Sequence, residues 1–193
     1  MQARLSEHLV ASGEAAKALA GDAAALSTLT GMADVMVGCL RAGGKILIAG
    51  NGGSAADAQH IAAEFVSRLM FNRAPLAAIA LADSAPILTA CGNDYGFEAV
   101  FARQITALGR SGDVFWGFST SGNSPNLLAG ATAAHAAGLV SIGFTGAGGG
   151  EMAAVFGQVF RAPSGQGQIV QQLHMMAAHA VLAAIEIAMF GQP

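Results

Sequence analysis

The feature that most constrains the fold is a series of five short apolar runs separated by longer stretches with helical patterns. Within each run the apolar residues do not alternate with polar ones, which is typical of parallel strands buried on both faces. The runs lie at residues 45–49, 76–81, 114–118, 140–144 and 155–160. Helical stretches begin near Ser54, Ser84, Gly96, Asn123 and Glu151. This rhythm predicts an α/β fold with a five-stranded parallel sheet flanked by helices.

Two helical patterns precede the first apolar run. One covers residues 3–19, and in the other, apolar residues recur at steps of three and four from Leu26 until Gly43 and Gly44 end the pattern. We expect residues 1–42 to form an N-terminal helical arm of the kind that packs on a neighbouring subunit. Because no linker, repeat or low-complexity tract interrupts the sequence, residues 1–193 are predicted to form a single domain.

Composition excludes one class of partner and indicates another. Only 11% of the residues are charged and the formal net charge is −3, so we expect no nucleic-acid binding, which depends on clustered Lys and Arg. A chain that is 53% hydrophobic with so little charge is predicted to bury apolar surface between subunits.

The sequence also indicates a cytoplasmic protein with no membrane partner. The apolar stretch at residues 169–190 contains glutamines, histidines and Glu186, which a lipid-facing span does not readily tolerate. Glu7 and Glu14 lie where an export signal needs a basic end and an apolar core. Cys39 and Cys91 lack metal-type spacing and are expected to be buried free thiols in a reducing compartment.

A glycine-rich loop, Gly50-Asn51-Gly52-Gly53-Ser54, follows the first predicted strand and opens a helix. Free backbone N–H groups at the positive end of that helix predict an anion-binding site. The loop also matches the loose form of the dinucleotide fingerprint, but Asp83 lies beyond the position where that fingerprint needs an acidic residue. NAD binding therefore stays open only as an alternative.

The third predicted strand runs into a second polar loop, which carries four hydroxyls in six residues: Ser119, Thr120, Ser121 and Ser124. An ordinary N-cap explains one or two of these hydroxyls but hardly four. Hydroxyls and helix N–H groups can bind a phosphate without lysine, and the Walker Gly-Lys-Ser/Thr sequence is missing. The loop therefore favours a sugar phosphate over a nucleoside triphosphate.

Polar residues on two helices can converge on one site. His60 and Glu64 share a helix face, and Gln171 and His179 diverge by only some 80° on the last helix, whereas His174 lies about 140° from His179. Two imidazoles, a carboxylate and an amide oxygen can complete a tetrahedral zinc site.

Several motifs between about Gly44 and Phe190 together carry a resemblance to a known family. They are GNGGS at 50–54, His60-x-x-x-Glu64, Asn93-Asp94, STSGNS at 119–124, and Gln171 with His179. The combination resembles the phosphoheptose isomerases of the sugar isomerase (SIS) family. The resemblance implies the SIS-type three-layer α/β sandwich, assembled as a homotetramer with active sites between subunits.

The resemblance also implies roles for particular residues. It places zinc, one ion per subunit, on His60, Glu64, Gln171 and His179, and the catalytic acid/base pair on Glu64 and His179. It places the substrate contacts on Asn51, Gly52, Gly53, Glu64, Asn93, Asp94, Ser119, Thr120, Ser121, Ser124 and Gln171. Ser54 joins them as an expectation of our own, because it lies at the start of a helix.

The implied reaction converts sedoheptulose 7-phosphate to D-glycero-D-manno-heptose 7-phosphate through an enediol, for lipopolysaccharide heptose biosynthesis. Isomerisation of another sugar phosphate stays open, because residues 163–169 lack the charges often found there and Gln172 stands where many relatives have Glu. A non-catalytic SIS protein that binds a replication-initiator partner is the alternative from another class, and the presence of both Glu64 and His179 argues against it.

Overall fold

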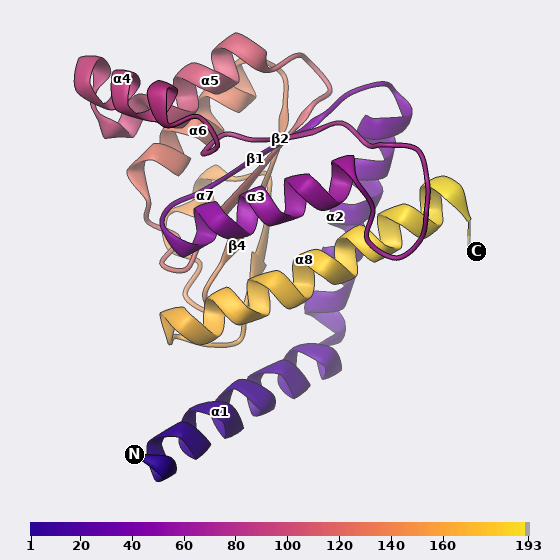
Figure 1. Cartoon of the computed structure of the whole chain (residues 1–193), viewed down its shortest axis with the longest axis vertical. Coiled ribbons are helices and arrows are strands. Elements are labelled where there is room, and N and C mark those ends of the chain that lie inside the picture. The colour runs from indigo at the N-terminus through magenta and orange to yellow at the C-terminus, as the bar shows by residue number, and fades with distance from the viewer. Residues whose placement is uncertain (192–193) are drawn as a thin grey trace.

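The predicted apolar runs form a single parallel sheet with the strand order β2-β1-β3-β4-β5 (Figure 1). These strands belong to a computed structural model that describes residues 1–191. The strands are β1 (Ile46–Gly50), β2 (Ala78–Ala80), β3 (Val114–Ser119), β4 (Val140–Thr145) and β5 (Gln158–Arg161). The predicted five-stranded parallel sheet is therefore confirmed.

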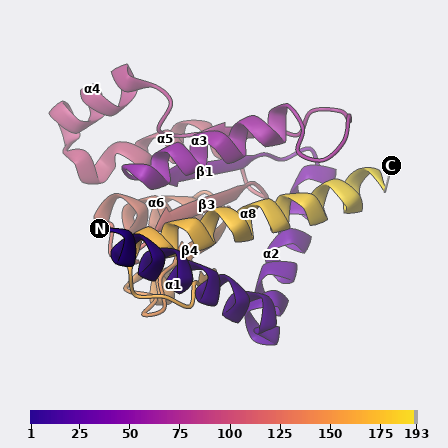
Figure 2. The ribbon, with the colours of Figure 1, turned by 60° about the horizontal axis from the view of Figure 1, so that its bottom comes forward.

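Helices cover both faces of this sheet and complete a three-layer sandwich (Figures 1 and 2). Their bounds are α1 (Gln2–Gly21), α2 (Ala23–Arg41), α3 (Gly53–Val66), α4 (Ala85–Tyr95), η1 (Phe97–Ala99), α5 (Val100–Leu108), α6 (Pro125–Ala136), α7 (Met152–Val155) and α8 (Gly167–Phe190). One core cluster joins α2, α3 and α8 to the sheet, and a second joins α5, α6 and α7 to its other face. The α/β architecture predicted from the sequence is confirmed.

The N-terminal arm consists of two helices of different environment. Asp22 separates them, because its side chain accepts hydrogen bonds from the N–H groups of Ala24 and Ala25 and so begins α2. Helix α2 packs into the core, whereas α1 extends beyond the sandwich with Leu5 and Leu9 61% and 70% exposed (Figure 1). Such exposed leucines on a helix are typical of a surface that contacts another chain.

Two sequence predictions need correction. Val155 lies in α7 rather than in a strand, and β5 begins only at Gln158, because the intervening Gly157 donates its N–H to the Ser141 hydroxyl instead of pairing with a strand. Cys39 is buried as expected, but Cys91 is partly exposed, because every residue of α4 is at least partly exposed.

Helices α2 and α8 are both long and apolar enough to span a membrane by length and composition. In this fold, however, they pack against each other and against the sheet, and they contribute residues to the same core cluster. Helix α8 contains two buried polar side chains, His174 and Glu186, each with hydrogen-bond partners inside the fold. Burial in a protein core therefore accounts for their apolar character.

The strand order places a topological switch point between the carboxyl ends of β1 and β3. These two strands are neighbours in the sheet, yet the helices that follow them, α3 and α6, lie on opposite faces. Open α/β sheets bind ligands at such a switch point, where loops diverge above the strand ends.

Candidate functional site

The glycine-rich loop and the hydroxyl-rich loop meet above β1 and β3. Asn51, directly after β1, and Asn126, in the first turn of α6, exchange a reciprocal pair of side-chain hydrogen bonds of 2.9 and 2.8 Å. Each amide gives the other a donor and an acceptor, which fixes the orientation of both. The two loops predicted to bind substrate are therefore joined by a defined contact.

Backbone geometry explains the glycines of the first loop. Gly52 has a φ of 56° and begins α3, a conformation that favours glycine. At Gly53, an added Cβ would lie 2.5 Å from the end of the Gln171 side chain, so glycine leaves room for this amide beside the loop. Ser54 is buried at the start of α3, and Gly50 packs against its backbone.

The hydroxyls of the second loop form a local network. The buried Ser119 hydroxyl lies 2.9 Å from that of Ser124 and 3.3 Å from that of Ser121, and it accepts the Gly122 N–H at 3.1 Å. Ser124 is the N-cap residue of α6, and its side chain caps no N–H group within residues 1–191. The amino end of α6 thus keeps a first-turn N–H group beside several hydroxyls, as an anion site requires.

The second loop also lies near another helix terminus. The Thr120 hydroxyl lies 3.8 Å from the position that a Cβ at Gly167, the first residue of α8, would occupy. The Thr120 carbonyl accepts the N–H of Gly146, which follows β4. Two helix amino ends, those of α6 and α8, therefore lie beside the Ser119–Ser124 turn, and both favour a negatively charged ligand.

Three predicted metal ligands come together between α3 and α8. The Nε2 atoms of His60 and His179 lie 3.1 Å apart. The Glu64 carboxylate contacts both rings, with Oε1 3.2 Å from His60 Nε2 and Oε2 3.4 Å from His179 Nε2. One ligand atom from each of the three side chains lies within 4.8 Å of the other two.

The donor set of this group fits a zinc ion. Two imidazole nitrogens and a carboxylate oxygen are one of the established sets of three protein ligands in catalytic zinc sites. Glu64 Oε2 is buried and has no good hydrogen-bond partner among residues 1–191, which leaves a lone pair of the carboxylate available to a cation. The residues present therefore match the metal that was predicted for them.

Gln171, the fourth predicted ligand, pairs with Asp57 and contacts none of the other three predicted ligands through a hydrogen bond that the structure shows within residues 1–191. Its Nε2 donates a hydrogen bond of 3.2 Å to Asp57 Oδ1, which leaves the amide oxygen free to contact a ligand. Asp57 is a polar residue that sequence reasoning missed, although it lies three residues before His60 on the same helix face. Burial raises the pKa of Asp57, despite the opposing effects of the Gln171 hydrogen bond and nearby His60.

His174 lies in the core and not in the site. Its ring is fully buried among Phe118, Phe144 and Phe160, and Nε2 lies 3.1 Å from the Thr145 carbonyl oxygen. Burial lowers the pKa of His174 to about 4, so the ring is neutral near pH 7. The helical angles predicted that His174 and His179 point in different directions from α8, and in the structure His174 points into the core.

Asn93 and Asp94 are positioned differently from the other predicted substrate contacts. Both are exposed on α4, and Asn93 donates a hydrogen bond of 2.8 Å to Asp94. The nearby Tyr95 ring stacks on the Arg103 guanidinium, whose central carbon lies 3.6 Å from the ring centroid. Asn93 and Asp94 thus face outward on a helix that is accessible to another molecule.

Comparison with known proteins identifies the family. Residues 15–146 match the SIS domain family. A protein of Burkholderia pseudomallei (strain 1710b) named phosphoheptose isomerase is 48% identical over 91% of this chain and 89% of its own length. One of Bradyrhizobium sp. (strain ORS 278) with the same name is 48% identical over 96% of this chain and 93% of its length.

Solved structures of proteins with the same name also resemble this chain. The phosphoheptose isomerase of Neisseria gonorrhoeae superposes with a TM-score of 0.89 at 40% identity, covering 95% of this chain and 98% of that one. That of Francisella tularensis gives a TM-score of 0.89 at 32% identity, covering 95% and 97%. The chain therefore belongs to the SIS-domain family, within the group of sugar-phosphate aldose–ketose isomerases named phosphoheptose isomerases.

Proposed function

We propose that the chain converts sedoheptulose 7-phosphate to D-glycero-D-manno-heptose 7-phosphate, and that it supplies the heptose of lipopolysaccharide. The observation that carries this proposal is the contact between Glu64 and His179, which come from distant parts of the sequence and meet at 3.4 Å. An aldose–ketose isomerase needs two such groups, because one proton moves between carbons while another moves between oxygens. The names of the relatives supply the substrate class.

The reaction then proceeds in two balanced steps. Glu64 removes a proton from C1 of the ketose, His179 gives a proton to the C2 oxygen, and the electron pair of the broken C–H bond forms the C1–C2 double bond of a cis-enediol. In the second step His179 takes the proton of the C1 hydroxyl and Glu64 returns a proton to C2, which yields the aldose. Each residue ends in the protonation state in which it began.

The geometry of Glu64 supports a double role. One carboxylate oxygen faces His60 and the other faces His179, so metal binding and proton transfer can use different oxygens. His60, Glu64 and His179, with the Gln171 oxygen as fourth ligand, would hold one zinc ion per subunit. When bound, such an ion supplies a Lewis acid that polarises a carbonyl oxygen.

We assign the substrate contacts to two groups of residues on the same proposal. The phosphate binds at the turn formed by Ser119, Thr120, Ser121 and Ser124, since hydroxyls and two helix amino ends meet there. The sugar chain extends toward the Glu64 carboxylate past Asn51, Gly52, Gly53, Ser54 and Gln171, and the Asn51–Asn126 and Gly53–Gln171 contacts hold this path in place.

We further propose a cytoplasmic homotetramer of single-domain subunits spanning residues 1–193, with active sites between subunits. Asn93 and Asp94 lie exposed on α4, and the apolar residues Leu5 and Leu9 lie exposed on α1. Association of copies would cover the apolar arm and would allow α4 of one subunit to complete the site of another.

The deciding experiment is an isomerase assay with sedoheptulose 7-phosphate, and with fructose 6-phosphate and ribulose 5-phosphate as shorter ketoses, with and without a chelator. We expect turnover of the seven-carbon substrate at least tenfold faster than of the others, loss of activity on chelation and recovery with Zn²⁺. Preference for a shorter ketose would contradict the substrate assignment. Full activity after complete metal removal would contradict the zinc site.

A further inference from the structure

A buried ion pair lies immediately beyond the Glu64–His179 contact. Arg73, in the segment between α3 and β2, places Nε 2.8 Å from Oε1 of Glu186 on α8, and the two side chains are 1% and 0% exposed. The Leu69 and Met70 N–H groups also donate to Glu186, each at 2.8 Å. These hydrogen bonds and the Arg73 charge outweigh burial, which by itself raises the pKa of a carboxyl group, and hold the pKa of Glu186 below its usual range.

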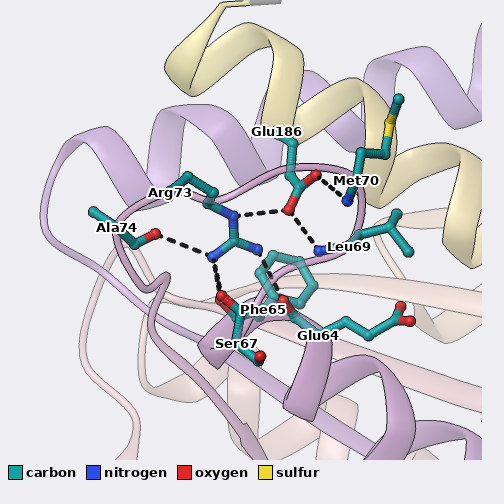
Figure 3. A network of polar contacts seen from close by, with 8 residues as sticks. All are labelled: Glu64, Phe65, Ser67, Leu69, Met70, Arg73, Ala74 and Glu186. Carbon is teal, nitrogen blue, oxygen red and sulfur yellow. Dashed lines mark hydrogen bonds and ion pairs between the residues drawn. The ribbon is translucent and has the colours of Figure 1, made fainter. Parts of the chain in front are cut away.

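The same arginine binds the end of the helix that carries Glu64. Arg73 Nη2 donates to the Glu64 carbonyl oxygen at 2.8 Å, and Nη1 donates to the Phe65 carbonyl oxygen at 2.6 Å (Figure 3). Carbonyls in the last turn of a helix lack intrahelical partners, and a cation there is favourable. Figure 3 shows the Glu64 carboxylate pointing away from Arg73 while its carbonyl faces the guanidinium.

Both ends of this network are tied to the proposed acid/base pair. Glu186 lies seven residues after His179 on α8, so the two side chains project within about 20° of each other, two turns apart. Arg73 holds the backbone of Glu64 itself. The network therefore links the helix segment that presents the carboxylate to the helix that presents the imidazole.

We propose that Arg73 and Glu186 are positioning residues that fix α3 against α8 and so set the separation between the Glu64 carboxylate and the His179 imidazole. The inference rests on the proposed function for its catalytic meaning. A purely structural role would explain why the Arg73–Glu186 pair is buried, since buried ion pairs occur in many protein cores. It does not account for a guanidinium that binds the carbonyl of the proposed catalytic residue and the helix of its partner at the same time.

The fold contains a chemically matched control in a second buried network. Asp113 accepts the N–H groups of Lys45 and Arg110 and pairs with the Lys45 ammonium. Like Glu186, it is a buried carboxylate with two backbone donors and one cation. Asp113→Asn and Glu186→Gln therefore make the same chemical change in this second network and in the network that binds the Glu64 backbone.

The test compares Arg73→Met, Glu186→Gln and Asp113→Asn with the parent protein in kcat, KM, thermal midpoint and Zn²⁺ affinity measured by competition with a chromophoric chelator. Misplaced catalytic groups cost on the order of 10- to 100-fold in rate, and residues that orient metal ligands cost about 10- to 100-fold in metal affinity. We expect such losses in kcat and Zn²⁺ affinity for Arg73→Met and Glu186→Gln, with KM within about threefold because the phosphate site is unchanged. Asp113→Asn should lower only the thermal midpoint.

A paired variant, Arg73→Met with Glu186→Met, separates positioning from stability. Replacing both ions with apolar side chains avoids the unpaired buried charge that each single variant leaves, but it cannot restore the hydrogen bond to the Glu64 carbonyl. We expect a thermal midpoint closer to that of the parent than either single variant gives, with a kcat that stays low. Parental kcat and Zn²⁺ affinity in the paired variant would overturn the proposal, and so would losses no larger than those of Asp113→Asn.

Crystal structures of the metal-free parent and paired variant give a readout that does not depend on turnover. The Glu64 Oε2 to His179 Nε2 distance, 3.4 Å here, should lengthen beyond contact in the variant, and an unchanged distance would overturn the inference. A parent protein that does not isomerise sedoheptulose 7-phosphate would refute the proposed function. The distance comparison would still decide the role of Arg73 and Glu186.

Discussion

Two polar clusters of the molecule differ in how completely their groups are already paired. At the amino ends of the strands, Asp113 is saturated by Lys45 and Arg110. Between α3 and α8, Glu64 Oε2 is buried with no good hydrogen-bond partner among residues 1–191, and one imidazole contacts each oxygen of the same carboxylate. A carboxylate thus stabilises the fold in one cluster and remains available to a ligand in the other.

The largest effect should come from the Glu64 cluster between α3 and α8. Glu64→Gln keeps the size of the side chain but removes the proton acceptor, and general-base catalysis contributes about 10²- to 10⁴-fold. We expect kcat to fall by that factor while circular dichroism stays unchanged. Steady-state assays of the zinc-loaded proteins measure the loss, and a variant with normal kcat would remove Glu64 from the chemistry.

The core contributes a pH-dependent effect through His174. Its pKa of about 4 in the folded protein lies below the ordinary value of 6.5, so protonation favours the unfolded state. Stability is fully present above pH 6.5 and declines as the pH falls toward 4, by on the order of 3 kcal/mol. Urea unfolding of the metal-free protein at a series of pH values measures the decline.

A control for the His174 effect is available in its surroundings. His174→Phe extends the cluster of Phe118, Phe144 and Phe160 with a ring that does not titrate. The difference in unfolding free energy between this variant and the parent should change between pH 6.5 and 4. A constant difference across that range would contradict a neutral buried histidine.

A smaller effect is expected at the amino end. Asp113→Asn weakens a charge-assisted network and should cost about 2 kcal/mol of unfolding free energy at pH 7, with kcat unchanged. Burial favours the neutral acid, but hydrogen bonds from Lys45 and Arg110 outweigh it and keep the pKa of Asp113 below its ordinary 3.8. Its contribution is therefore present above pH 4 and lost below, and acid unfolding of the two proteins should converge there.

The smallest effect should arise in the Ser119–Ser124 turn, the proposed phosphate site. Ser119→Ala removes one of the two acceptors of the Gly122 N–H and the partner of the Ser124 hydroxyl. One weakened hydrogen-bond group costs roughly 1.4 kcal/mol, which is about tenfold in affinity. We expect KM to rise by that factor with kcat nearly unchanged, and a selective loss of kcat would argue that the turn does more than hold the phosphate.

The sequence predicted the parts of the molecule that depend on local pattern. The buried strands were recognisable from their apolar runs, and the motif residues His60, Glu64 and His179 do meet. The start of β5 was misplaced because Val155 is apolar in either a strand or the short helix α7. Periodicity alone cannot separate these two environments over so few residues.

Contacts between distant segments escaped the sequence analysis. Asp57 and Arg73 find their partners, Gln171 and Glu186, only because α8 packs beside α3. Glu186 had attracted notice only as an interruption of an apolar helix. A single sequence contains no signal that pairs such residues, because the pairing is decided by tertiary packing.

The reciprocal amide pair of Asn51 and Asn126 has an evolutionary consequence. Each side chain requires an amide opposite it, so replacing either one with a carboxylate or an aliphatic residue leaves a donor or acceptor of the other unmatched. The two positions are therefore expected to vary together across relatives, and a lineage that loses one asparagine should carry a compensating exchange at the other.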